Sequence, residues 1–186
     1  MRAFIGMDFG NEVNGQIYEI QEKLRKYARK GRWKDIDNLH LTLKFLDEIS
    51  PTQKIDIDEV MKEISITRRP LYLTISELGF FKGSGSIPVL WLGLEGDIEE
   101  LHSLHEETDK ALSAIGFLPE KRMFKPHITI GQDIIFTCDF NQICEEIGKI
   151  QIDTTNINSI FLFKSMQIHN KRVYFKETEY NFSRKA

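Results

Sequence analysis

Two short segments of this chain carry the residue types of an acid/base site: His-Leu-Thr-Leu at residues 40–43 and His-Ile-Thr-Ile at residues 127–130. Alternate side chains of a β-strand share a face, so each tetrad places its histidine and threonine together and its two apolar residues opposite. One such tetrad arises readily by chance, but two copies separated by nearly half the chain predict a shared site. If the tetrads face each other across a cleft, two imidazoles and two hydroxyls surround one centre.

Two histidines across a cleft suit a reaction that needs a base and an acid in the same step, because an imidazole titrates near pH ~6.5. The threonine hydroxyls can donate hydrogen bonds to an anionic group held between them. A phosphodiester fits, since one histidine can activate the nucleophile while the other protonates the leaving alkoxide. The scheme requires no metal or other cofactor, and no carboxylate cluster with metal-ligand spacing is evident in the sequence. The candidate catalytic residues are His40, Thr42, His127 and Thr129.

The spacing of apolar residues predicts alternating strands and helices around these tetrads. We expect helices at residues 11–30, 51–65, 97–115 and 139–149, the first ended by Gly31 and the third by Gly116. We expect strands at residues 2–9, 38–46, 70–81, 87–94, 125–131, 158–168 and 171–180, with a turn at Asn170. The order repeats in the two halves, which favours two similar lobes joined by the turn or loop at residues 83–86.

Composition sets wide limits on the class of protein. The 186 residues, 41% hydrophobic and 28% charged, suit one globular domain or two small lobes and exclude a disordered chain, a collagen or a coiled coil. No apolar run is long enough for a membrane span, and the first residues lack the apolar stretch of a signal peptide. Two cysteines, Cys138 and Cys144, are too few for a disulfide framework, so we expect a cytoplasmic protein. The net charge of −3 argues against coating nucleic acid through bulk charge but allows a local basic patch.

With both tetrads in view, the chain resembles the 2H phosphoesterase superfamily, and most closely the LigT-like RNA 2′,3′-cyclic phosphodiesterases, once described as 2′-5′ RNA ligases. The resemblance covers nearly the whole chain. Besides the tetrads it rests, in order, on MRAFIGMDF, RWKDIDNLHLTLKFLDEI, LGFF, VLWLGLE and GFLPEKRMFKPHITIG. It implies an α+β fold over residues 1–186, made of two lobes that each contribute one tetrad. Two antiparallel sheets would face a central groove, with the helices outside.

The resemblance also implies a reaction, hydrolysis of a 2′,3′-cyclic phosphate to a 2′-phosphate. Carried onto this sequence, it makes His127 the general base that activates water and His40 the general acid that protonates the departing 3′ oxygen. The site is nearly symmetric, so the reverse assignment stays open. The chain departs from the family at Gln132, where a basic residue is common, and at Asp47, where glycine is common. These departures bear on affinity and substrate, not on the reaction class.

Several basic residues are candidates for substrate binding. Lys44 shares the expected face of His40 and could add charge near a phosphate, or lie at the groove edge in solvent. The second tetrad is preceded by Lys121, Arg122 and Lys125, which could steer an anionic substrate. The basic run at residues 23–34 is either an RNA-backbone surface or a solvated helix face.

Aromatic residues near the tetrads have two interpretations, base stacking or core packing: Trp33, Phe81 and Phe124. His102 and His105 have a spacing that could chelate a metal, but no third ligand is near, so we expect both on the surface. Two other functions remain open for the same groove: an RNA- or nucleotide-binding module with little catalysis, and 2′-5′ ligation of RNA ends. The expected ligand is RNA with a cyclic phosphate end or a small cyclic nucleotide. We expect no membrane, no obligate protein partner and a monomer, because one chain holds both halves of the site.

Overall fold

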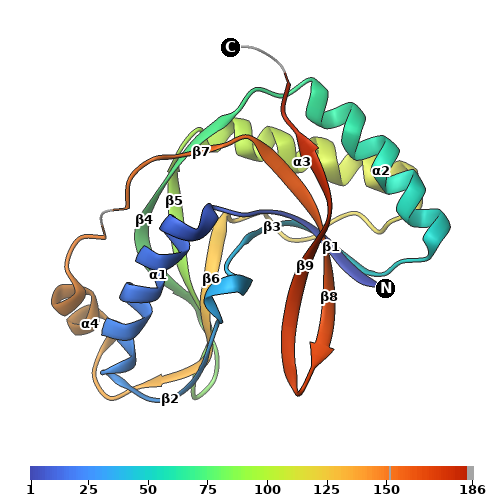
Figure 1. Ribbon diagram of the computed structural model, residues 1–186. Helices are drawn as coiled ribbons and strands as arrows, with labels where there is room; N and C mark the ends of the chain where they lie inside the picture. Colours follow the sequence, from blue (N-terminus) through green and yellow to red (C-terminus); the bar gives the residue numbers. More distant parts are fainter. Residues whose placement is uncertain (151, 184–186) are drawn as a thin grey trace.

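The computed structural model describes residues 1–150 and 152–183 as an α+β fold with a strongly curved antiparallel sheet (Figure 1). The sheet has the strand order β7-β4-β5-β6-β3-β1-β8-β9, and β2 also pairs with β6. Its strands are β1 (Arg2–Met7), β2 (Ala28–Trp33), β3 (Leu41–Glu48), β4 (Leu71–Phe81), β5 (Ile87–Gly96), β6 (His127–Phe136), β7 (Thr155–Ile157), β8 (Ser159–Ile168) and β9 (Lys171–Asn181).

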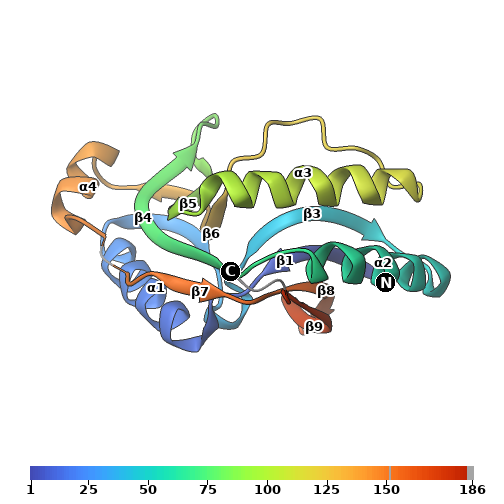
Figure 2. The same ribbon diagram turned by 90° about the horizontal axis from the view of Figure 1, so that it is seen from above.

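In the described part of the chain, four α-helices and one short 3-10 helix lie outside this sheet, as Figure 2 shows from above. They are α1 (Gly10–Arg25), η1 (Ile36–Asn38), α2 (Pro51–Ile66), α3 (Ile98–Ala114) and α4 (Phe140–Ile147). Helices α2 and α3 lie side by side over the half of the sheet that contains β3 and β9, whereas α1 contacts α4 and β2 in the other half. Helix α2 begins at a capping box formed by Ser50 and Gln53, with Pro51 in its first turn.

The predicted α+β architecture of two antiparallel halves is confirmed, and the halves join into one sheet where Leu41 of β3 pairs with Ile128 of β6. The lobes, however, do not follow the two halves of the chain. Strand β4 pairs with β5, and β8 returns from the end of the chain to pair with β1. Residues 83–86 therefore form the turn of the β4–β5 hairpin inside one lobe, and the prediction that they link the lobes is wrong.

The first helix is shorter than predicted, because the last part of its predicted range forms a separate strand. It ends at Arg25, and residues 28–33 form β2, which pairs with β6. Gly31 does not end the helix but lies in this strand, where a Cβ would collide with Ile134. Half of the residues in this segment are charged and it shows no apolar alternation, so only its pairing with β6 reveals the strand. The short strand β7 was likewise not predicted, whereas Gly116, with a φ of 100°, ends α3 as expected.

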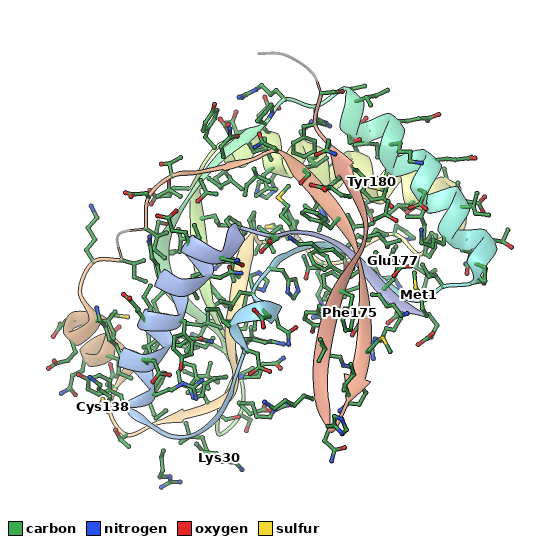
Figure 3. All side chains as sticks on the ribbon, in the orientation of Figure 1. Met1, Lys30, Cys138, Phe175, Glu177 and Tyr180 are labelled. Carbon is green, nitrogen blue, oxygen red and sulfur yellow. The ribbon has the colours of Figure 1, made fainter. Side chains whose placement is uncertain are left out.

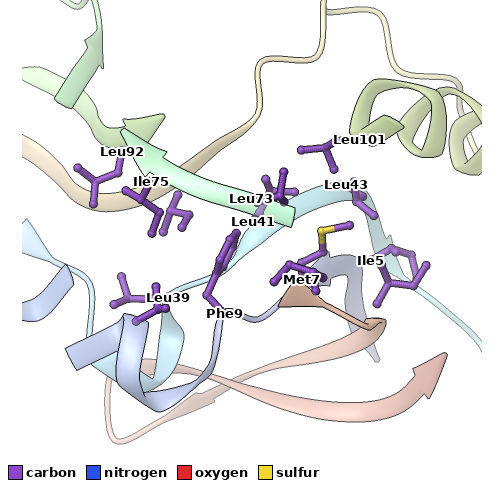
Figure 4. Packing of buried hydrophobic residues seen from close by; sticks show 14 of the residues in the cluster. Ile5, Met7, Phe9, Leu39, Leu41, Leu43, Leu73, Ile75, Leu92 and Leu101 are labelled. Atoms are coloured by element: carbon purple, nitrogen blue, oxygen red, sulfur yellow. The ribbon is translucent and has the colours of Figure 1, made fainter. Parts of the chain in front are cut away.

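The hydrophobic core fills the space between the sheet and the helices (Figure 4). Leu41 and Ile128, the pair that joins the two halves, are both completely buried. Figure 4 shows Leu41 among the side chains of β1, β4 and β5, including Met7, Leu73 and Leu92. The apolar faces of both tetrad strands therefore lie against one common core.

Replacing Leu41 by alanine should remove packing from both halves at once. Because Leu41 is fully buried, we expect Leu41→Ala to lower the free energy of unfolding by about 3 kcal/mol, measured by urea denaturation. Lys62→Ala, at an exposed position of α2, is the control and should change it by less than about 0.5 kcal/mol. If both substitutions had the same small effect on the free energy of unfolding, Leu41 would not be a central residue of the common core.

Candidate active site

The two tetrads meet at the centre of the sheet. Strands β3 and β6 are antiparallel and pair at Leu41 and Ile128. Antiparallel pairing about these two residues brings each histidine toward the threonine of the other tetrad. The two central apolar residues are buried, whereas the histidine and threonine of each tetrad are half-buried. The alternation expected from the sequence thus holds through both tetrads, and it puts the four candidate catalytic side chains on the face away from the core.

His40 has a tightly defined environment. Its Nδ1 lies 2.7 Å from the carbonyl oxygen of Asn38, and its ring packs against Phe4, with centroids 4.6 Å apart, and edge-on against Tyr174 at 5.0 Å. The pKa of His40 is lowered to about 4, chiefly by burial; the Asn38 carbonyl opposes this shift, and the positive charges of Lys34 and His127 add to it. Because β3 and β6 pair at Leu41 and Ile128, the two imidazoles come from adjacent positions of neighbouring strands.

His127 has a matching environment in the other lobe. Its Nδ1 lies 2.6 Å from the carbonyl oxygen of Lys125, and its ring packs edge-on against Phe81 with centroids 5.2 Å apart. Burial lowers the pKa of His127, the Lys125 carbonyl opposes this, and the Lys125 ammonium lowers it further.

A cation lies over the aromatic ring beside each histidine. Lys34 Nζ is 6.0 Å from the centroid of Tyr174, and Lys125 Nζ is 5.9 Å from the centroid of Phe81 and 4.0 Å from that of Trp91. The site therefore has approximate twofold symmetry beyond the tetrads themselves. Positive charge on both sides of the histidines favours an anionic ligand.

The two backbone contacts decide which nitrogen of each imidazole can react. A carbonyl oxygen can only accept, so Nδ1 of each neutral histidine carries the hydrogen. Nε2 then holds a lone pair that can take a proton, or, once protonated, a hydrogen that it can give. The arrangement supplies two equivalent proton-transfer groups and two hydroxyl donors.

The prediction that Lys44 shares the face of His40 is wrong. Gly6 of β1 pairs with Thr42 but Ile5 pairs with Lys44, so Leu43 is an extra residue in a β-bulge. Beyond the bulge the Lys44 side chain is 2% exposed, forms an ion pair with Asp109 of α3 and donates to the Leu118 carbonyl. Lys44 thus stabilises the protein beneath the sheet and is not available to a phosphate in the groove.

The other three predicted binding residues lie in the segment between α3 and β6, which runs back along α3 in Figure 2. Lys125 is exposed and lies beside His127, as described above. Lys121 and Arg122 are exposed farther back along the same segment.

The local structure accounts for both departures from the family pattern, Gln132 and Asp47. Gln132 lies opposite Arg32 of β2, so a basic residue stands beside the position where one is common. Asp47 has a φ of 55°, a left-handed conformation that favours glycine but that aspartate tolerates.

Sequence reasoning did not find two of the groups around His40. Tyr174 comes from β9, next to Phe175, which Figure 3 labels on the β8–β9 hairpin. Asn38 was noted only as a neighbour of the tetrad, yet its side chain donates to the Arg172 carbonyl at 2.7 Å and accepts from the Tyr174 amide. An alternating strand near the end of the chain was the only signal for Tyr174, and it does not reveal which strand is its neighbour.

The remaining candidates lie away from the groove or at its edge. Phe124 stacks on His105, with ring centroids 4.0 Å apart, and Arg25 lies over Trp33. We expected His105 on the surface, but it is buried. Its Nδ1 donates to the Leu43 carbonyl at 2.9 Å, which satisfies its polar group there. Of the basic run at residues 23–34, Lys34 lies at the site, whereas Figure 3 shows Lys30 at the outer edge of β2.

Two negative findings apply to residues 1–150 and 152–183. In this part of the chain no three His, Cys, Asp or Glu side chains gather in a way that could hold a metal ion. None of its helices is long and apolar enough to cross a membrane.

Comparisons with known proteins point to one family and one fold. Residues 9–91 match the family described as LigT like Phosphoesterase. A Thermotoga maritima protein named RNA 2′,3′-cyclic phosphodiesterase is 36% identical over 147 residues, covering 79% of this chain and 78% of that protein. An Escherichia coli protein of the same name is 31% identical over 134 residues, covering 71% of this chain and 72% of that protein.

Solved structures show the same fold. Escherichia coli LigT complexed with 3′-AMP superimposes with a TM-score of 0.82 at 23% identity, and a Thermus thermophilus protein, TT0787, with 0.81 at 20% identity. Each comparison covers 98% of this chain and 98% of the other chain.

The fold and the paired tetrads define a phosphoesterase of the 2H type, as the sequence predicted. Within that class, the chain belongs to the LigT-like phosphoesterase family. The expectation of an enzyme of the phosphoesterase class is confirmed with the family.

The contact between Lys44 and Asp109 yields a stability prediction. Burial raises the pKa of Asp109, but the hydrogen bonds from Lys44 and from the Glu120 amide outweigh it, and the net shift is downward. This carboxylate therefore stabilises the fold above its unfolded pKa of about 3.9, and the stabilisation is lost as the pH falls through the lower folded pKa. Lys44→Met should cost about 3 kcal/mol at neutral pH, because it leaves Asp109 unpaired.

Urea denaturation of wild type and Lys44→Met at neutral pH and near pH ~3 measures this effect. The difference between the two proteins should narrow at acidic pH, where Asp109 becomes neutral. Lys44→Met combined with Asp109→Leu is the matched control and should regain most of the loss at neutral pH. A difference that stays constant with pH would show that the ion pair is not its source.

Proposed function

We propose that this protein hydrolyses 2′,3′-cyclic phosphates at RNA ends to 2′-phosphates. The observation that carries the proposal is the meeting of His40 and His127 at the β3–β6 junction, each with Nδ1 held by a carbonyl and Nε2 left to react. The names of the curated relatives support the cyclic phosphate as substrate. The cations beside both histidines suit the anionic substrate that this reaction requires.

In the proposed reaction, His127 Nε2 takes a proton from a water molecule whose oxygen attacks phosphorus. The bond between phosphorus and the 3′ oxygen breaks, and His40 Nε2 gives a proton to that oxygen. The products are a 2′-phosphomonoester and a free 3′ hydroxyl. Thr42 and Thr129 donate hydrogen bonds to the non-bridging oxygens, on which negative charge develops. No step is assigned to a metal ion.

The assignment of base and acid is the one that the resemblance to the family implies. A neighbouring lysine lowers the pKa of each histidine, Lys125 that of His127 and Lys34 that of His40, where Asp8 is a weaker opposing charge. The phosphodiester anion, once bound, raises the pKa of both imidazoles and so allows His40 to hold the proton that it must give. Lys125, Lys121 and Arg122 are proposed to attract the substrate to the groove.

Loss of either histidine should abolish turnover. We expect His40→Ala and His127→Ala each to lower kcat by at least about 100-fold, because each removes one proton-transfer step. The assay identifies the 2′-phosphate released from an RNA with a cyclic phosphate end in the presence of EDTA. His102→Ala, on α3 and outside the groove, is the control and should retain wild-type turnover.

Wild-type-like turnover in both variants would refute the two-histidine mechanism. Salt-sensitive RNA binding without turnover by the wild type would favour a binding module instead. A product with a new 2′-5′ bond would indicate ligation.

The lowered histidine pKa values predict the pH dependence. The general acid must be protonated and the general base neutral, so kcat/KM, which reports the free enzyme, should peak below pH ~6.5 and fall as the pH rises. The optimum of kcat should lie at higher pH, because the bound anion raises both pKa values. Steady-state kinetics between about pH 4 and 9 measure both profiles.

Removing one charge assigns the limbs of the profile. Lys125→Gln removes the cation that lowers the pKa of His127, so that pKa rises. The limb of the profile that reports His127 should therefore move to higher pH. A profile that Lys125→Gln leaves unchanged would contradict the participation of His127 in turnover, and Lys62→Gln on α2 should shift neither limb.

A further inference from the structure

Phe45 is a large apolar residue that the fold exposes to solvent. The β-bulge at Leu43 turns Lys44 inward and Phe45 outward, and 64% of the Phe45 side chain is exposed. Two contacts from α3 and its following segment stabilise this arrangement: His105 donates to the Leu43 carbonyl and Lys44 donates to the Leu118 carbonyl. The fold thus holds an aromatic ring toward solvent while it buries the adjacent lysine.

The exposed ring lies next to the candidate active site. Phe4 connects the two, since its ring centroid is 4.6 Å from that of His40 and 6.1 Å from that of Phe45. A hollow of about 120 Å³ opens beside Phe45, with Arg2, Arg172, Ser165 and Tyr174 in its lining. This volume is too small to enclose a nucleoside but leaves room for a charged group beside a base that stacks on the rim.

Cations gather at this end of the groove. Lys34 directly follows β2, and its Nζ lies 6.0 Å from the ring centroid of Tyr174 in β9, the strand that also carries Arg172. The charges of Arg32 and Arg172 add to the effect of burial in lowering the pKa of Lys34. Arg32 is paired with Asp133 and Arg2 lies 3.7 Å from Asp47, but within the described residues Lys34 and Arg172 have no ion-pair partner. Asn38 also donates to the Arg172 carbonyl, which fixes the backbone of Arg172 near the first tetrad, and the Arg172 side chain lines the hollow beside Phe45.

We propose that Phe45, Arg172 and Lys34 form a subsite for the nucleotide that precedes the cyclic-phosphate end. Its base stacks on Phe45, and the phosphate that links it to the terminal nucleotide lies between Arg172 and Lys34. Stacking on an exposed aromatic ring accepts any base, and guanidinium and ammonium groups bind the phosphate backbone. The proposal rests on the proposed function and narrows its substrate to RNA of at least two nucleotides.

The experiment compares two substrates that share their terminal nucleoside: a mononucleoside 2′,3′-cyclic phosphate and a dinucleotide with the same cyclic end. Phe45→Ala and Arg172→Ala should each lower the ratio of kcat/KM for the dinucleotide to kcat/KM for the mononucleotide by about tenfold, through KM. The matched controls are Ile55→Ala, an exposed apolar residue of α2, and Lys62→Ala on the same helix, which should keep the wild-type ratio.

Binding of the dinucleotide 2′-phosphate, measured by calorimetry, tests the subsite without turnover. Weaker binding by Phe45→Ala and Arg172→Ala than by both controls supports the subsite even if the wild type hydrolyses neither cyclic substrate, an outcome that would refute only the proposed function. An unchanged substrate ratio together with unchanged binding overturns the subsite. An equal loss on both substrates also overturns it, because Phe45 or Arg172 would then act on the terminal nucleotide.

Discussion

The pairing of Leu41 with Ile128 is the contact on which the site depends. It is the point at which β3 meets β6, and it joins two curved halves into one sheet. Because both side chains are fully buried, neither strand can slip by one residue without exposing its apolar face to the groove and burying its histidine. The hydrophobic effect thereby sets the mutual position of two polar groups that do not touch each other.

A second constraint acts along β3. Helix α3 supplies His105 and Asp109 beneath the strand, and these side chains satisfy the Leu43 carbonyl and the Lys44 ammonium. An unpaired lysine would not remain buried there, so the ion pair and the bulge depend on each other. The same local irregularity that removes Lys44 from the groove adds Phe45 to it.

Burial and nearby polar groups have opposite effects on the pKa values of the two histidines. Both histidines lose affinity for protons on burial, and both retain a carbonyl contact that would stabilise the imidazolium. In the proposed reaction, the charge of the bound phosphodiester would raise the pKa of both imidazoles. The substrate would then bring the proposed acid into its protonated form.

The sequence by itself determined the tetrads, their alternation, most helices and strands and the family, because each depends on local spacing or on specific short motifs. It did not reveal β2, because a charged strand has no apolar period and forms only where β6 offers it hydrogen bonds. Nor could it place Tyr174 beside His40 or Arg172 near Lys34, since these contacts join residues far apart in the chain. Only the tertiary structure decided the faces of Lys44 and Phe45, because one extra residue in β3 reverses the alternation that a sequence pattern assumes.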